Sequence, residues 1–306
     1  MLAATAAMLG VALAVPGAFG ADARPFGVAY LVVRLLHFVL SWIVARKDPV
    51  RRGVLIRFAP TAFVGASLIL LAGFLDSDVR IVLWLVALAI DYLGPVVIGI
   101  GRGWHVAPAH FAERHGLIIL IALGESIIAI GVGAELHIDT GDLATAVLGM
   151  AIVSALWWLY FDVAALFARR RLIETTGLQR ARLACDAYSY LHLPMIAGIV
   201  LFALGLRTTL HHIGQALETV PAVALCGGTA LYLLAQVAFL RRTMGRIFRR
   251  RTAGALVMLA LIPAALAIPA LSALALVGAV CSLIVVYEAI GRREYRAQLR
   301  HPAGVS

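Results

Sequence analysis

The chain is 306 residues long, and 62% of its residues are hydrophobic while only 14% are charged. A soluble domain carries about 25% charged residues, so this composition excludes a soluble globular protein and indicates a polytopic membrane protein. The formal net charge of +10 does not indicate nucleic-acid binding, because the basic residues lie between apolar stretches, where membrane orientation explains them.

Ten apolar segments, separated by charged or Pro/Gly-containing breaks, predict ten transmembrane helices of about 20 residues each. The expected spans are 2–20, 26–45, 54–75, 80–100, 113–134, 142–167, 185–206, 217–240, 253–270 and 272–291. The predicted fold class is therefore all-α, a polytopic helical bundle that forms a single membrane domain over residues 1–306. Because Pro263 and Pro269 interrupt the last apolar stretch, one broken helix plus another span is an alternative there.

The first segment is apolar and runs into Gly-Ala-Asp-Ala at residues 20–23, which resembles the end of a secretory signal peptide. It lacks the basic residues with which such peptides begin, so we expect it to be retained as a span. Cys185, Cys226 and Cys281 are isolated, and their spacing indicates neither a disulfide framework nor a zinc site.

Lys and Arg residues are divided unequally between the two sets of connections. Of the 26, 22 lie in or beside the connections after the even-numbered segments and three after the odd-numbered ones, while Arg34 lies within the second segment. Loops rich in Lys and Arg stay in the cytoplasm, so both termini are predicted to be cytoplasmic.

The segment Glu113–Gly133 is apolar and long enough to span, yet it carries Glu125 and Ser126 in its middle. A carboxylate at the centre of a bilayer costs about 2.5–3.5 kcal/mol even on lenient scales, so such a group normally faces protein or water. Glu113 and His115 stand at the start of this span. Its glycines, among them 116, 124 and 131, are expected to allow close packing of neighbouring helices.

Other polar residues lie inside the predicted spans. With the predicted orientation, nearly all of them fall between the midplane and the cytoplasmic face, which predicts one polar chamber that opens inward. The candidate site residues are Arg34, His37, Asp91, Glu113, His115, Glu125, Ser126, Asp162 and His192. Structural alternatives remain open: an Arg34–Asp91 ion pair, packing roles for the histidines, and a structural Glu288.

The run His110–Gly131, HFAERHGLIILIALGESIIAIG, resembles the signature of the bacterial low temperature requirement A family of integral membrane proteins. The match is carried by Glu113, Arg114, His115, Gly116, Ala122, Leu123, Gly124, Glu125, Ser126 and Gly131. WWLYFD at 157–162 and the segment Tyr190–Pro194 also resemble family features, and residues 105–200 form the core motif region.

This resemblance implies a multi-pass protein of the bacterial inner membrane with a role in growth in the cold, a stress response. Members of the family usually open with a helix that contains Phe-Phe-Asp, and no such sequence is found here. We therefore expect this chain to lack the usual first helix, through truncation or a misplaced start.

The leading functional hypothesis is a proton- or cation-coupled transporter or channel. Glu125, Asp91 and Asp162 would titrate or bind cations, His37 and His192 would relay protons, and Arg34 would hold an anionic group or tune a nearby acid. The expected partners are the lipid bilayer and protons, cations or a small solute. Neither substrate nor oligomeric state is indicated.

Two alternatives stay open: an intramembrane enzyme that uses Asp91 and Asp162 as paired carboxylates, and a membrane sensor or structural protein. Catalysis is the less favoured, because neither a serine-hydrolase motif nor a phosphate-binding loop occurs. His110 and Glu113 share a helix face with His115 nearby, but no further ligand has a fitting spacing. No catalytic residue, metal or cofactor is predicted.

Overall fold

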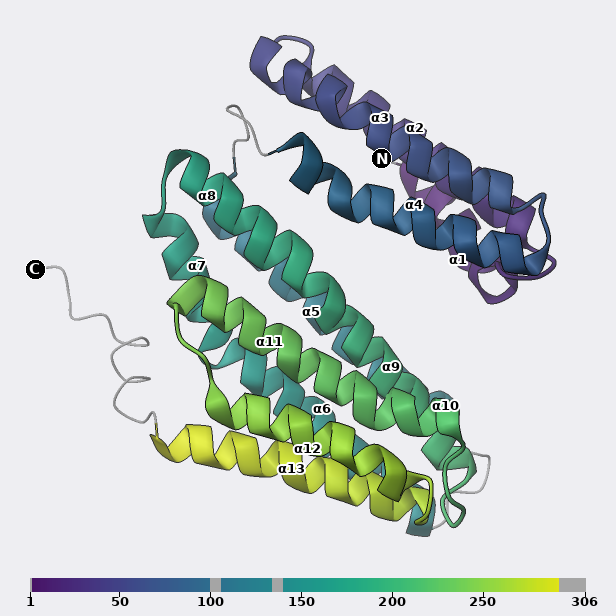
Figure 1. The fold of residues 1–306 in the computed structure, drawn as a ribbon, viewed down its shortest axis with the longest axis vertical. Helices are drawn as coiled ribbons and strands as arrows, with labels where there is room; N and C mark the ends of the chain where they lie inside the picture. Colours follow the sequence, from purple (N-terminus) through teal and green to yellow (C-terminus); the bar gives the residue numbers. More distant parts are fainter. Residues whose placement is uncertain (1, 100–105, 134–139, 292–306) are drawn as a thin grey trace, which may run out of the picture. The chain divides into compact units, whose positions relative to one another are not determined.

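The computed structural model describes residues 2–99, 106–133 and 140–291, and these residues form helices joined by short turns, with no named strand among them. The chain divides into two compact units, residues 1–105 and residues 106–306, and each is described by itself. The predicted all-α fold is confirmed (Figure 1).

The first unit contains four successive helices that pack in chain order, α1 on α2, α2 on α3 and α3 on α4. They are α1 (Leu2–Ala14) followed by the 3-10 turn η1 (Val15–Gly17), α2 (Ala23–Ala45), α3 (Pro49–Ala72) and α4 (Ser77–Ile98). Asp48 starts α3, because its carboxylate accepts hydrogen bonds from the amides of Val50 and Arg51 and is followed by Pro49. A Cβ at Gly27 would lie 2.7 Å from Leu70 Cα, so glycine sets how closely α2 approaches α3.

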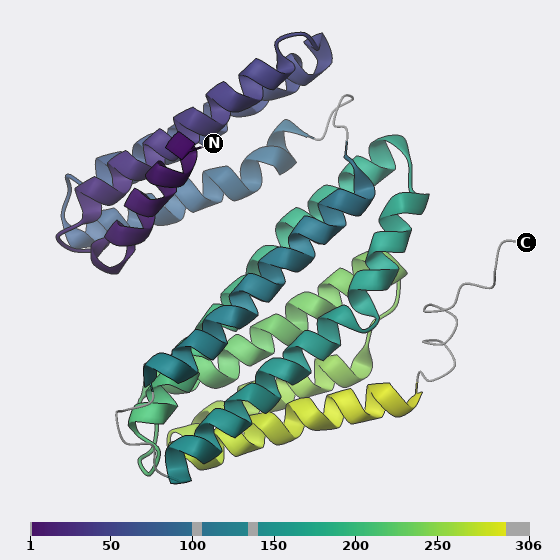
Figure 2. The same cartoon turned by 180° about the vertical axis from the view of Figure 1, so that it is seen from behind.

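The second unit is a larger bundle whose long helices α5, α9 and α11 lie side by side in both views (Figures 1 and 2). Its α-helices are α5 (Pro108–Gly133), α6 (Thr140–Phe161), α7 (Ala164–Glu174), α8 (Gly177–Leu183), α9 (Leu191–His211), α10 (Thr219–Ala222), α11 (Gly228–Met244), α12 (Arg249–Ala265) and α13 (Ala270–Gly291). The π-helical segments η2 (Ala184–Tyr190) and η3 (Val223–Gly227) make 177–211 and 219–244 continuous helices.

Helix α9 is the centre of this second bundle, since it packs against both α5 and α11. Its contact with α11 depends on glycine: a Cβ at Gly198 would lie 2.6 Å from the carbonyl oxygen of Gly228. Phe202 and Leu206, which follow on α9, have no exposed surface. Close backbone contact of this kind is the usual way in which membrane helices pack.

Each of the ten predicted apolar segments overlaps helical residues in the described part of the chain. Seven helical stretches of the described residues are long and apolar enough to cross a membrane: 23–45, 49–72, 108–131, 140–174, 177–211, 219–244 and 270–290. The first apolar helix, 2–17, is shorter, and α12 has only 17 residues. The chain is therefore a multi-pass helical membrane protein, with a span count close to that expected.

In the second unit, the chain breaks between α12 and α13 and between α6 and α7. The split of the last apolar stretch is confirmed, because α12 ends at Ala265 and α13 begins at Ala270. The turn between them is held by hydrogen bonds from Leu217 N to Ala265 O (3.2 Å) and from Ala270 N to Gln215 O (2.8 Å). The predicted segment 142–167 lies within the span-length stretch 140–174, but a turn at 162–163 inside it separates α6 from α7.

Candidate functional site

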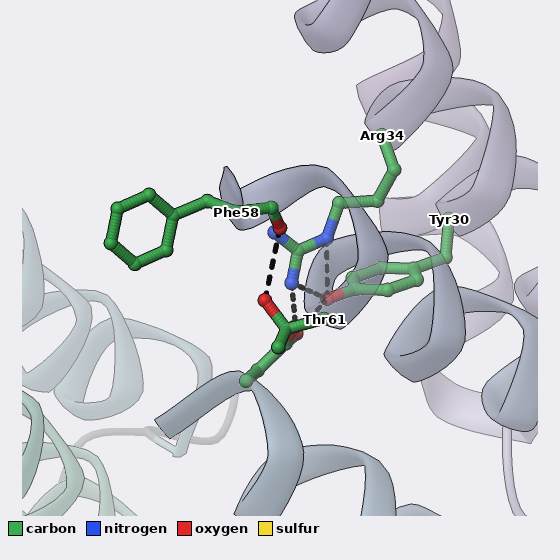
Figure 3. Close-up of polar contacts among 5 residues, drawn as sticks. Tyr30, Arg34, Phe58 and Thr61 are labelled. Carbon is green, nitrogen blue, oxygen red and sulfur yellow. Dashed lines mark hydrogen bonds and ion pairs between the residues drawn. The ribbon is translucent and has the colours of Figure 1, made fainter. Parts of the chain in front are cut away.

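In the unit of residues 1–105, one ion pair links α2 to α4. The Arg34 guanidinium pairs with the Asp91 carboxylate, which is one of the structural alternatives that the sequence left open. Arg34 Nη2 also donates a 2.7 Å hydrogen bond to the Tyr30 hydroxyl, and that hydroxyl in turn donates to Asp91 Oδ2 at 3.4 Å. Figure 3 shows Arg34 and Tyr30 converging from α2. We call Tyr30, Arg34 and Asp91 the Arg34–Asp91 site.

Glycine on α3 makes room for this site. A Cβ at Gly65 would lie 3.0 Å from Asp91 Oδ1, so the carboxylate occupies the space that a side chain would need. Thr61, one turn earlier, donates its hydroxyl to the Phe58 carbonyl at 2.9 Å (Figure 3). Its hydroxyl hydrogen is therefore already committed and does not bind Asp91.

A cavity of about 250 Å³ adjoins the site, with Tyr30 and Asp91 in its lining. The rest of its lining is apolar: Phe19, Ile69, Ile81, Trp84, Leu85 and Leu88. The side chains of Arg34 and Asp91 are 31% and 21% exposed, so the ion pair is partly open. A charge pair in this setting can change its partners or gain a proton without unpacking the helices.

The unit of residues 106–306 brings His115 and His192 together. Their ring centroids are 5.0 Å apart in an edge-to-face arrangement, and Tyr188 stacks on His192 at 5.3 Å. The cluster is completed by the rings of Phe111, Tyr160 and Phe239. The sequence placed both histidines among the site residues but did not pair them, because the contact depends on how α5 packs against α9.

His192 is buried, with its two ring nitrogens hydrogen-bonded. Its Nε2 lies 2.7 Å from the Tyr160 hydroxyl, and its Nδ1 lies 3.2 Å from the Ala187 carbonyl. A neutral ring with its hydrogen on Nδ1 satisfies both contacts, because Nδ1 donates to the carbonyl and Nε2 accepts from the phenol. This geometry favours the packing role that the sequence left open for His192.

Glu125 and Ser126 lie on different sides of α5. Ser126 has no exposed surface, and its hydroxyl has no hydrogen-bond partner in the described part of the chain. Glu125 is exposed at the surface of its unit. The expected close packing at glycines holds for Gly116, whose Cβ would lie 3.4 Å from Phe161, but a Cβ at Gly124 would meet nothing within 4 Å.

The remaining predicted residues stand apart from these groups. His37 and Glu113 are exposed on α2 and α5. Asp162 is buried, but it lies in the turn after α6 and not within a helix as expected. The expected chamber draws on residues of both units, so it stays a prediction.

One buried polar network was missed by the sequence reasoning. Arg251 forms two parallel 2.8 Å contacts with the Glu288 carboxylate and also donates to Gln236 Oε1 at 2.5 Å, which joins α12 to α13 and α11. The sequence placed Arg251 in a basic connection, yet it is 1% exposed. The signal was Gln236, an uncharged amide in the middle of an apolar run, which requires a partner in the bundle.

No group of three or more His, Cys, Asp or Glu side chains is placed to hold a metal ion in the described ranges. In the candidate group on α5, His110 instead accepts a 2.9 Å hydrogen bond from Arg114 Nε, and His115 Nδ1 lies 2.9 Å from the Phe111 carbonyl.

The chain is similar to known bacterial proteins. A family model described as bacterial low temperature requirement A protein matches residues 1–286. An uncharacterized protein of Rhizobium meliloti (strain 1021) is 28% identical over 251 residues, which is 78% of this chain and 60% of that relative's length. No solved structure matches the chain.

Proposed function

This chain belongs to the bacterial low temperature requirement A family, and on that premise we propose that it is a proton- or cation-coupled transporter or channel of the bacterial inner membrane. We further propose that the two units act as one membrane domain, with both termini in the cytoplasm. The charge asymmetry of the connections supports this orientation.

The Arg34–Asp91 site is the observation that carries the proposal. Two charges within membrane helices are costly, and an ion pair kept only for stability can often be replaced by apolar side chains without loss. Here the pair is partly open, and the carboxylate lines a cavity. Such a placement is typical of a group that exchanges protons or binds an ion.

The proposed step is a change of protonation at Asp91. As a carboxylate, Asp91 balances the charge of Arg34 and accepts from Tyr30. When a proton binds, the carboxylic acid no longer compensates Arg34, which then needs water or an anionic solute as its partner. Proton binding and solute binding are coupled in this way through one arginine.

The acids and histidines of the second unit are proposed as the other polar groups of the pathway. Glu125, with Ser126 next to it, supports this best, because a carboxylate at the surface of a span-length helix needs protein or water beside it. Asp162, His115, His192, Glu113 and His37 remain secondary candidates.

The experiment is proton flux into proteoliposomes that hold the purified full chain and a pH-sensitive dye. Asp91→Asn and Arg34→Gln are expected to lower the flux at least tenfold. Asp48→Asn is the matched control, because Asp48 is an exposed acid of the same unit and asparagine also caps helices well. Equal flux in Asp91→Asn and wild type, at equal protein content, contradicts the proposal.

The paired-carboxylate enzyme stays an untested alternative, because Asp91 contacts Arg34 and Tyr30 within its own unit, while Asp162 belongs to the other unit. A role in growth at low temperature rests on the family description alone. We retain it as part of the proposal and test it below.

A further inference from the structure

A second, polar cavity of about 620 Å³ lies in the unit of residues 106–306. Its lining contains no residue of the cluster around His115 and His192. It is bounded by α7, α8 and the last residues of α11. Its polar lining comes from Arg171, Glu174, Thr175, Gln179, Arg182, Arg242 and Thr243. None of these residues belongs to the proposed proton pathway.

The charges in this cavity are not balanced. Arg242 pairs with Asp186 at 2.9 Å, and Glu174 pairs with Arg170 at 2.9 Å, so these two lining charges are compensated. The carbonyl of Arg171 accepts hydrogen bonds from Thr175, but no hydrogen bond or ion pair of the Arg171 or Arg182 guanidinium is found with the part of the chain that the structure describes. The cavity therefore presents two guanidinium groups with no anionic partner among the described residues.

The two guanidinium groups suit an oxyanion such as phosphate. The planar fork of arginine binds the oxygens of phosphates and carboxylates through two parallel hydrogen bonds, which a lysine ammonium cannot do. The lining also contains Gln179, a neutral hydrogen-bond donor for phosphate oxygens.

The position of the cavity fits the same ligand. Leu166 and Ile173 on α7 and Leu178 on α8 are each 42% exposed, so apolar surface stands close to the charged lining. Basic pockets next to membrane helices on the cytoplasmic side bind anionic head groups. We propose that this cavity binds a phosphate group through Arg171 and Arg182, supplied by an anionic lipid or by free phosphate.

The test uses the full chain in nonionic detergent with two probes. Phosphatidylglycerol retained by the protein is counted by native mass spectrometry, and inorganic phosphate binding is measured by calorimetry. The variant Arg171→Gln/Arg182→Gln is expected to lose at least tenfold in affinity for the probe that binds. The control Arg169→Gln/Arg241→Gln removes the same charge from α7 and α11, outside the lining, and is expected to bind as wild type does.

The two probes separate the two sources. Lipid retention without phosphate binding assigns the site to a head group, and phosphate binding without lipid retention assigns it to the free anion. Arg171→Lys/Arg182→Lys keeps the charge but removes the fork, so intermediate affinity is expected. Binding of neither probe, or equal loss in the control pair, overturns the proposal. Circular dichroism confirms that each variant is folded.

Discussion

Two arginine–carboxylate pairs of the described residues, Arg34–Asp91 in the first unit and Arg251–Glu288 in the second, are built differently. Arg34 and Asp91 are 31% and 21% exposed, share their contacts with a tyrosine and stand next to a cavity. Arg251 and Glu288 are 1% and 6% exposed and meet through two parallel contacts, with Gln236 as a third member. The first pair has room to change partners, whereas the second has none.

This difference separates a pair suited to exchange from a pair that fixes packing. Breaking a buried pair leaves one charge without compensation, which costs about 3–5 kcal/mol, whereas exposed pairs contribute about 0.2–1 kcal/mol. From their burial we expect that loss of the Glu288 carboxylate lowers stability, whereas loss of the Asp91 carboxylate lowers activity.

The largest effect is expected from Glu288→Gln. It leaves Arg251 buried beside a neutral amide, so the free energy of unfolding should fall by about 3–5 kcal/mol. Unfolding by denaturant in detergent, followed by circular dichroism, measures this loss. The triple variant Gln236→Leu/Arg251→Met/Glu288→Leu removes the whole buried network and should recover most of it. If Glu288→Gln is as stable as wild type, the Arg251–Glu288 pair does not stabilise the fold more than the Arg34–Asp91 pair does.

A smaller effect on stability is expected from Asp91→Asn. The pair is partly exposed and Tyr30 still contacts Arg34, so the loss should be about 1 kcal/mol in the same denaturant titration. Unlike Glu288→Gln, this variant should remain folded while its proton flux is lost. A loss of stability as large as that of Glu288→Gln would make Asp91 a packing residue.

The smallest effect on stability is expected from Glu125→Gln. The side chain is exposed in its unit, so the free energy of unfolding should change by less than about 0.5 kcal/mol. Cold growth in a strain without its own family member tests function separately. The glutamine variant, at normal membrane abundance, is expected to fail to restore growth. Full rescue would remove Glu125 from the proposed pathway.

The sequence predicted the helices well because the bilayer fixes their length and apolar character. It offered the Arg34–Asp91 pair as an alternative, because two opposite charges in apolar spans are costly to leave apart. It did not predict that Arg251 is buried. Arg249 and Arg250 precede it in a basic run typical of a connection, and only the packing of α11 and α13 around α12 encloses the third arginine.

The break at Asp162 was also beyond sequence reasoning, since no proline or glycine marks it. The partners of His192 could not be predicted either. Tyr160 is 32 residues away in the sequence, and it reaches the imidazole only because α6 packs against α9. Contacts of this kind depend on the arrangement of helices, which hydropathy does not encode.

The short helix α12 has a consequence for the lipid around the protein. Its 17 residues rise about 25 Å, whereas the hydrocarbon core of a bilayer is about 30 Å thick. Leu256, Val257 and Leu259 of α12 are exposed. Arg251, in the first turn of the same helix, is buried. If α12 spans the bilayer, we expect the lipid beside it to thin, at a cost that rises with each ångström of mismatch. We therefore expect the stability of the protein to depend on membrane thickness, a property that lipid composition changes.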